Sequence, residues 1–187
     1  GNKKGGAAGP QRPGTAPQEL DNLKTAIEKE FLNATQGIDR VCFRSARHKY
    51  VMKYSALAEI LETKNSKVGG RYNPPGIAML YLSCDRYTCL AEATHALEQT
   101  SINAAKILPL TIFAIRVKVS KILDLTDNGV RQALSVQESD LKDEDNTTNW
   151  FAIQHSNQEP PTQSIGRLAK EAGFGRCNDS TILRTRI

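Results

Sequence analysis

The chain has 187 residues, of which 39% are hydrophobic and 24% are charged. This is the length and composition of one globular domain with a core of its own, and it argues against two full domains. No apolar run approaches the roughly 18 residues that a membrane-spanning helix needs, and the N-terminus has no apolar block like that of a signal peptide. We therefore expect no association with a membrane.

The net charge of +5 is distributed unevenly along the chain. Lys3, Lys4 and Arg12 supply three of these charges before the first acidic residue, so the rest of the chain is close to neutral. Such a balance does not predict direct nucleic-acid binding. A basic nucleic-acid-binding domain remains an alternative, which rests only on the isoelectric point of about 9.1.

The four cysteines and three histidines do not form a metal-binding pattern. There is no C-x-x-C pair and no paired ligand spacing, so we expect no structural zinc and no other metal. A disulfide framework normally belongs to a smaller secreted chain with denser cysteines. The cysteines are therefore predicted to be free thiols in a reducing cytosol.

Residues 1–18 differ in composition from the rest of the chain. They contain five of the 13 glycines and three of the eight prolines, and they lack aromatic residues. Such a stretch cannot bury enough apolar surface to offset the entropy lost on ordering. We interpret it as a flexible tail or linker, either native or a cloning remnant, and we place the folded domain at residues 19–187.

The first elements follow from apolar spacing. Apolar residues recur three and four positions apart in residues 19–33, which predicts an amphipathic helix. These residues are Leu20, Leu23, Ile27 and Phe31. Residues 41–44 are predicted as a short strand, and Ser55 is a suitable N-cap for a helix over 55–61.

A glycine- and proline-rich loop separates this region from the next. Residues 69–76 read GGRYNPPG, which excludes regular structure but defines a shaped loop. Residues 77–83 are then predicted as a strand. Asp85 is a good N-cap for a helix over 87–99, which is rich in leucine and alanine.

The second half combines one strand with short helices. Residues 110–119 alternate between apolar and exposed positions, which predicts a strand with one solvated face, and residues 121–125 are expected to continue or restart it. Asp127 can cap a short helix that ends at Leu134.

The last third begins with an acidic, polar loop over 141–149. Residues 163–172 form a predicted helix that ends at Gly173, a typical C-cap residue. Residues 181–187 are a weak final strand. Helices and strands interleave without the regular rhythm of a parallel sheet, so the fold class is α+β.

Three motifs, in this order and spacing, resemble the signature of a known family. They are GGRYNPPG at 69–76, LYLS at 80–83 and CLAEATH at 89–95. Together they resemble the RES domain family, which comprises NAD-degrading toxins of bacterial toxin–antitoxin systems. Further matches are VCFR at 41–44, ILDLT at 122–126 and Thr162-Gln163, so the resemblance covers roughly residues 40–175.

The resemblance implies a fold related to ADP-ribosyltransferase toxins, with a small split β-sheet that holds NAD and helices around it. It also implies the residues of a site. The implied catalytic residues are Glu92, Tyr81 and Arg71. The implied NAD-binding residues are Arg44, Arg71, Tyr72, Tyr81 and Ser180.

Two of these positions depart from the family pattern. Tyr72 lies where the family often has tryptophan. In the family, the serine usually follows a Gly-Phe pair and comes directly after a proline. Here Gly173-Phe174 is followed by a tail that contains no Pro-Ser pair. Ser180 is the nearest candidate for this serine. We expect the residues after about Asn178 to be peripheral and Ser180 to contribute little.

The chemistry of NAD is an independent reason to expect these residue types at such a site. A guanidinium matches phosphate oxygens with two donors, which suits Arg71. Cleavage of the nicotinamide–ribose bond develops positive charge on the ribose, which a carboxylate such as that of Glu92 stabilises. Tyr81 can either stack on the nicotinamide ring or donate a hydrogen bond.

Each assignment has a structural alternative. Arg71 and Arg44 can be ion-pair partners of nearby acids, and Glu92 can be a solvated helix residue. Tyr81 can fill the core, and Ser180 can be an ordinary turn or strand residue.

The leading functional hypothesis is a toxin-like enzyme that consumes NAD as its substrate, as a glycohydrolase or phosphorylase. One alternative is a catalytically inactive module that binds NAD or an antitoxin, and another is an ADP-ribosyltransferase that acts on a macromolecule. The resemblance also implies a cognate antitoxin or immunity protein as partner. The expected site of action is the cytoplasm, reached from within the cell or by delivery as part of a larger secreted toxin.

Overall fold

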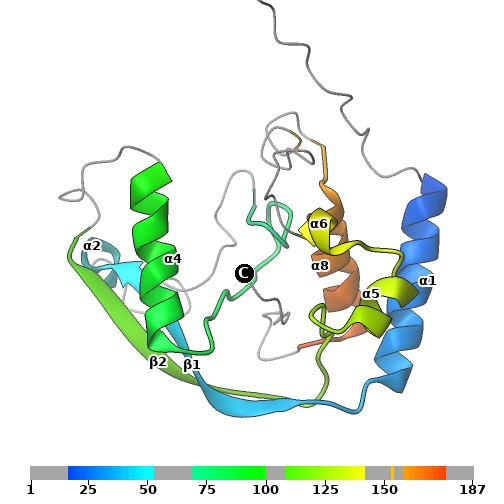
Figure 1. The fold of residues 1–187 in the computed structure, drawn as a ribbon, viewed down its shortest axis with the longest axis horizontal. Coiled ribbons are helices and arrows are strands. Elements are labelled where there is room, and N and C mark those ends of the chain that lie inside the picture. The colour runs from blue at the N-terminus through cyan, green and yellow to red at the C-terminus, as the bar shows by residue number, and fades with distance from the viewer. Residues whose placement is uncertain (1–16, 53–68, 100–107, 142–152, 154–157, 176–187) are drawn as a thin grey trace, which may run out of the picture.

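The computed structural model describes residues 17–52, 69–99, 108–141, 153 and 158–175. Within these residues the chain forms a two-stranded sheet and helices at both of its ends (Figure 1). The elements in chain order are α1 (Pro17–Asn33), β1 (Ile38–Arg47), α2 (His48–Val51), α4 (Arg86–Gln99), β2 (Leu110–Val119), α5 (Asn128–Ala133), α6 (Glu138–Leu141) and α8 (Pro161–Ala172). The α+β class predicted from the sequence is confirmed.

Strands β1 and β2 pair antiparallel along their whole length, from Ile38 opposite Val119 to Arg47 opposite Leu110. The prediction for residues 110–119 is confirmed, and the strand predicted at 41–44 is the middle of a longer one. Residues of both strands form a small hydrophobic cluster, which we call the sheet cluster. Its buried members are Cys42, Val117, Val119 and Ile122.

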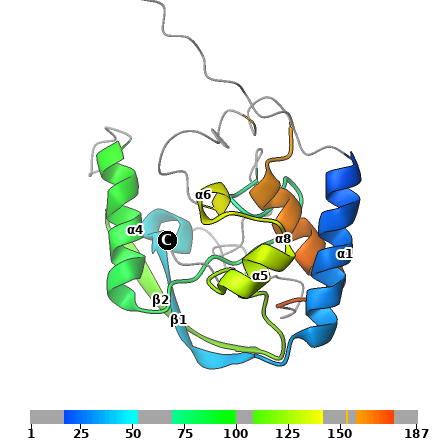
Figure 2. The same ribbon diagram turned by 45° about the vertical axis from the view of Figure 1, so that its right-hand side comes forward.

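Helices α1, α5, α6 and α8 gather at the other end of the sheet from α4 (Figures 1 and 2). They enclose the larger hydrophobic cluster, which we call the helical cluster. Its buried members are Ile27, Tyr72, Met79, Leu123, Leu125, Leu134, Leu141, Ile165, Leu168, Ala169 and Phe174. Ile27 lies on the apolar stripe that predicted α1, which confirms that helix.

Helix α8 ends as predicted, at Gly173 in a left-handed conformation with φ of 102°. Its next residue, Phe174, is fully buried and packs edge to face on Phe31 of α1, with ring centroids 5.1 Å apart. The end of α8 is thereby held against α1.

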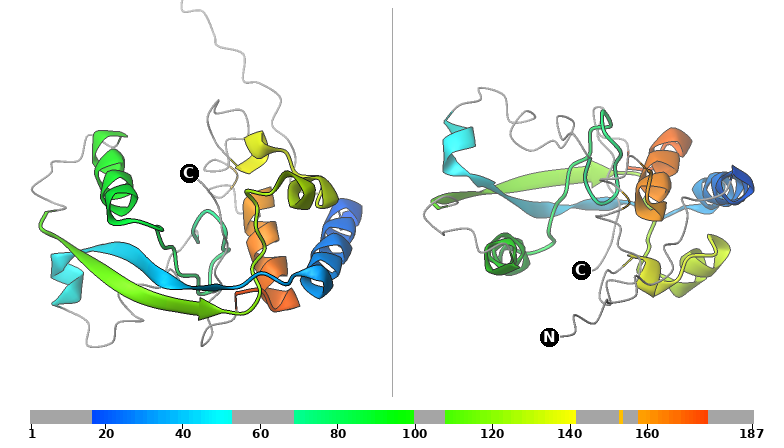
Figure 3. Two further views of the ribbon diagram at one scale, coloured as in Figure 1. Left: turned by 60° about the horizontal axis from the view of Figure 1, so that its bottom comes forward. Right: turned by 90° about the horizontal axis from the view of Figure 1, so that it is seen from above.

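Two strands predicted from the sequence are not formed. Residues 77–83 make only isolated bridges, and the bridge between Ser83 and Phe43 of β1 comes at the end of the segment. Met79 and Tyr81 of this segment pack in the helical cluster, whereas Leu82 packs on the sheet cluster, so the segment crosses from one cluster to the other (Figure 3).

The second strand that is not formed is the one predicted at residues 121–125. Ile122 packs in the sheet cluster, whereas Leu123 and Leu125 pack in the helical cluster. Neighbouring side chains are therefore buried on both sides of a connecting segment. The apolar content of residues 121–125 is that of a strand, which explains the prediction. Among the described residues, however, these residues have no partner strand.

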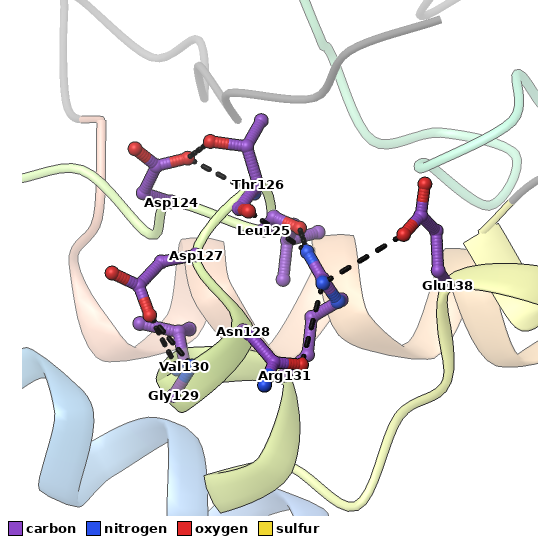
Figure 4. A network of polar contacts seen from close by, with 9 residues as sticks. All are labelled: Asp124, Leu125, Thr126, Asp127, Asn128, Gly129, Val130, Arg131 and Glu138. Carbon is purple, nitrogen blue, oxygen red and sulfur yellow. Dashed lines mark hydrogen bonds and ion pairs between the residues drawn. The ribbon is translucent and has the colours of Figure 1, made fainter.

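The turn after this connection is held by a polar network (Figure 4). Arg131 donates to the backbone oxygens of Leu125 and Thr126, at 3.0 and 2.9 Å. Asp127 caps α5 by accepting from the backbone nitrogens of Gly129 and Val130, which confirms the predicted cap. The network fixes the turn at the end of the ILDLT motif (residues 122–126).

Several predictions lie outside the described residues, namely the helix at 55–61, residues 1–16 of the predicted tail at 1–18, nearly all of the acidic loop at 141–149 and the strand at 181–187. Pro17 and Gln18, the last two residues of that predicted tail, instead begin α1, since proline suits the first turn of a helix. Leu141, the first residue of that loop, closes α6, which was not predicted. Within the described part of the chain, no helix is both long and apolar enough to cross a membrane.

Candidate active site

The GGRYNPPG loop contains a tight turn whose first two glycines, Gly69 and Gly70, are required by the close approach of neighbouring atoms. Gly69 has φ of +78°, and the Gly70 nitrogen donates to the Asn73 oxygen at 2.9 Å. A side chain at Gly70 would place its Cβ 2.6 Å from both Asn73 Oδ1 and the Tyr81 hydroxyl. The turn therefore presents Arg71 at a defined position between Gly70 and a buried core residue, Tyr72.

Tyr81 fixes this loop through its hydroxyl. The hydroxyl donates to Asn73 Oδ1 and accepts from the Tyr72 backbone nitrogen, both at 2.8 Å. Asn73 is fully buried, and its Nδ2 donates to the Ile77 oxygen at 2.8 Å. A hydroxyl has a single proton to donate, and that of Tyr81 is committed to Asn73.

Burial raises the pKa of Tyr81 to about 12, although its hydrogen bond from Tyr72 and the charges of Arg44 and Arg71 oppose the shift. Tyr81 therefore keeps its proton throughout the physiological pH range. Of the two roles predicted for Tyr81, stacking by the ring is the one that leaves this network intact.

Helix α8 holds the same loop from the other side. Gln163 Nε2 donates to the Gly70 oxygen at 2.8 Å, and Gln163 is 2% exposed. A Cβ at Gly166 would lie 1.7 Å from the Tyr72 oxygen, so only glycine permits this approach of helix and loop. The loop that carries Arg71 is therefore clamped between α8 and Tyr81.

Glu92 is positioned by α4 and by Ser83. Helix α4 begins as predicted, because Asp85 Oδ1 accepts from the backbone nitrogens of Tyr87 and Thr88 at 2.9 and 2.8 Å. Glu92 lies on the second turn of this helix and is exposed, and its Oε2 accepts from Ser83 Oγ at 3.0 Å. Ser83 is buried, so it restricts one oxygen of an otherwise accessible carboxylate.

Arg44 extends from β1 into the same neighbourhood. Burial lowers its pKa, whereas the nearby Cys89, Glu92 and Tyr81 raise it. Its Nε is buried and has no hydrogen-bond partner among the residues that the structure describes. Arg44 is thus a guanidinium with an unused buried donor, within electrostatic range of Glu92 and Tyr81.

The structure thus brings Arg44, Tyr81 and Glu92 together, and Arg71 lies close enough to act on the charge state of Tyr81. Tyr72 is different: it is 4% exposed and its ring is part of the helical cluster. Its contribution here is the backbone nitrogen bound to Tyr81. Ser180 lies outside the described residues.

Three contributors were not predicted as site residues: Asn73, Ser83 and Gln163. Each lies within one of the family motifs, GGRYNPPG, LYLS or Thr162-Gln163. Membership in these motifs was the signal in the sequence that could have identified them. No cluster of three or more metal-ligating side chains occurs in the described ranges.

Comparison with known proteins gives the family of the chain. The family model described as the RES domain matches residues 39–177, which contain Arg44, Arg71, Tyr81 and Glu92. The chain therefore belongs to the RES domain family. No curated protein matches it.

Among solved structures, the chain is similar to one described as the crystal structure of the M. tuberculosis MbcT–MbcA toxin–antitoxin complex. The TM-score is 0.57 at 23% sequence identity, and the match covers 81% of this chain and 72% of the other. At this identity the match establishes a shared fold. The fold of this RES domain is thus one that a solved toxin–antitoxin complex also contains.

Proposed function

We propose that the protein consumes NAD⁺ by cleaving the bond between nicotinamide and ribose, and that ADP-ribose passes to water or phosphate. The observation that carries this proposal is the juxtaposition of the accessible Glu92 carboxylate with Arg44 and Tyr81, in a chain of the RES domain family. A carboxylate beside fixed cations suits a substrate that has a pyrophosphate and develops a cationic ribose.

Arg71 and Arg44 are the proposed pyrophosphate ligands. A guanidinium offers a planar fork of donors that binds phosphate oxygens in pairs. The Arg44 Nε donor supports this role, because a buried donor costs free energy until a ligand satisfies it. The clamped loop supports it for Arg71, because a rigid position lowers the ordering cost of binding.

Glu92 is the proposed stabiliser of the developing ribosyl cation. Its Oε2 is engaged by Ser83, which orients the carboxylate. A fixed carboxylate beside the anomeric carbon stabilises an oxocarbenium-like transition state more than the neutral ground state. Tyr81 is proposed to stack against nicotinamide, since its hydroxyl proton is committed to Asn73.

The residue two positions before Glu92 supports a small acceptor. In the wider group of ADP-ribosyltransferase toxins that the RES family resembles, arginine-modifying enzymes carry a second acid two residues before the catalytic glutamate. This chain has Leu90 at that position, and its side chain is 43% exposed. An exposed leucine has no acceptor to hold a guanidinium. We therefore favour water or phosphate over transfer to an arginine of a protein.

The test is incubation of the full chain with NAD⁺, with and without phosphate, followed by identification of the products. We expect free nicotinamide, with ADP-ribose or its 1-phosphate as the second product. Glu92→Gln keeps the shape of the side chain and should lower turnover about 100-fold or more. Glu28→Gln, on the exposed side of α1, is the matched control and should be unaffected.

Two results would contradict the proposal in different ways. Normal nicotinamide release by Glu92→Gln would remove Glu92 from the mechanism. Tight binding of NAD⁺ by the unmodified chain without any turnover would favour the catalytically inactive module instead.

We further propose that residues 19–187 form the functional domain, that it acts in the cytoplasm and that a cognate antitoxin binds it. Ile27 of α1 lies in the helical cluster, which supports a domain that begins before the family match at residue 39. The similar solved structure is itself a toxin–antitoxin complex. Expression should arrest growth, and a cognate antitoxin or Glu92→Gln should relieve the arrest.

A further inference from the structure

Cys42 and Cys84 adjoin an isolated antiparallel bridge between β1 and the segment before α4. Phe43 and Ser83 exchange both backbone hydrogen bonds, at 2.8 and 2.9 Å. In an antiparallel pair the residue before Phe43 lies opposite the residue after Ser83, and these residues are Cys42 and Cys84. Because Phe43 and Ser83 form the hydrogen-bonded pair, the next position is a non-hydrogen-bonded one, where Cα atoms are about 4.5 Å apart.

Two further contacts keep Cys84 beside β1. Arg40 Nη2 donates to the Cys84 backbone oxygen at 3.3 Å. The pKa of Cys42 is raised first by burial and then by its electrostatic interaction with Cys84, which requires the two thiols to be near each other. Both contacts agree with the pairing deduced from the bridge.

From this geometry we propose that Cys42 and Cys84 form a reversible disulfide that links β1 to the segment before α4. Disulfides need Cα atoms about 4.4–6.8 Å apart with both Cβ atoms on the same side. Directly opposed residues of an antiparallel pair point to the same face, and the non-hydrogen-bonded spacing falls within that range.

The two thiols differ in access, which sets the order of steps. Cys84 is exposed and Cys42 is 6% exposed. With hydrogen peroxide as the oxidant, the Cys84 thiolate attacks one peroxide oxygen, the O–O bond breaks, and protonation of the leaving hydroxide gives water and a sulfenic acid. The Cys42 sulfur then attacks the Cys84 sulfur, and its proton leaves with the displaced hydroxide as a second water. In total, the two sulfurs give two electrons to one molecule of peroxide. A dithiol reduces the disulfide back to two thiols by thiol–disulfide exchange.

Cys89 is the competing partner and is already engaged. It is buried, and its thiol has a hydrogen bond with Ser45 of β1. The link between Cys42 and Cys84 would add a covalent bond next to Ser83, which holds Glu92. The proposed disulfide thus fastens the segment that orients this carboxylate, and its formation does not depend on what the site binds.

Tryptic digestion separates all four cysteines, which makes the test direct. Cys42 lies in peptide 41–44, Cys84 in 72–86, Cys89 in 87–106 and Cys177 in 177–184. The full chain is treated with hydrogen peroxide in small molar excess, remaining thiols are alkylated, and the digest is analysed by mass spectrometry. We expect a linked 41–44/72–86 peptide, lighter by two hydrogen atoms than its parts and abolished by dithiothreitol.

Variants and an unfolded sample supply the controls. C89S/C177S, which retains only the proposed pair, should form the same link in a monomeric chain, and C84S should not form it. Oxidation in denaturant should scatter the links among all cysteines. A native 72–86/87–106 link, a Cys84 sulfinic acid with Cys42 still alkylated, or a disulfide between two chains would each overturn the proposal.

Discussion

The hydroxyl of Tyr81 joins three parts of the site, so its removal tests the site's construction directly. Tyr81→Phe deletes the donor to Asn73 Oδ1 and the acceptor of the Tyr72 nitrogen, both bonded at 2.8 Å. Asn73 and Tyr72 are 0% and 4% exposed, so water cannot replace the hydroxyl without rearrangement. A buried polar group that loses its partner costs about 1–3 kcal/mol. We expect the free energy of unfolding to fall by about 2–4 kcal/mol for the two groups together.

Urea denaturation followed by circular dichroism measures this change. The matched control is Tyr87→Phe, since Tyr87 is 70% exposed and its hydroxyl accepts only from Arg86 among the contacts described. Its cost should stay below about 0.5 kcal/mol. If Tyr81→Phe proves as mild as Tyr87→Phe, the hydroxyl does not hold the loop and the proposed position of Arg71 loses its support.

Two further predictions concern the same residues. Because burial raises the pKa of Tyr81 from 10.0 to about 12, the unfolded chain loses this proton at a lower pH than the folded chain does. The free energy of unfolding should therefore fall by roughly 3 kcal/mol between pH 10 and 12. In Tyr81→Phe this fall should be smaller. Arg71→Lys should mainly raise the NAD⁺ concentration needed for half-maximal turnover, with Arg71→Ala raising it further, because an ammonium lacks the planar fork. Steady-state assays check this, and normal kinetics in both variants would make the loop purely structural.

Local signals in the sequence predicted the regular elements well. The N-cap Asp85 located the start of α4, alternation located β2, and Gly173 located the end of α8. These features depend on residues within one or two turns of each other. The sequence therefore contains nearly all the information that such an element needs.

The strands predicted at 77–83 and 121–125 failed for a tertiary reason. Both segments pass from one hydrophobic cluster to the other, so both are apolar without continuous pairing. The site shows the same limit. The family motifs pointed to Arg71, Tyr81 and Glu92, whereas the contacts of Ser83 and Gln163 with the site depend on which segments meet in space.

The same crossing segment determines how the two halves of the site are placed. Arg71 belongs to a loop that is anchored in the helical cluster through Tyr72 and to α8 through Gln163. Glu92 belongs to α4, which packs on β1 at the other end of the molecule (Figure 3). Residues 77–83 connect them, with Tyr81 bound to the loop and Ser83 bound to both β1 and Glu92. A segment paired along its whole length with β1 would pull Tyr81 away from Asn73. The absence of a regular strand here is therefore what allows one short stretch to hold both the GGRYNPPG loop and the Glu92 carboxylate.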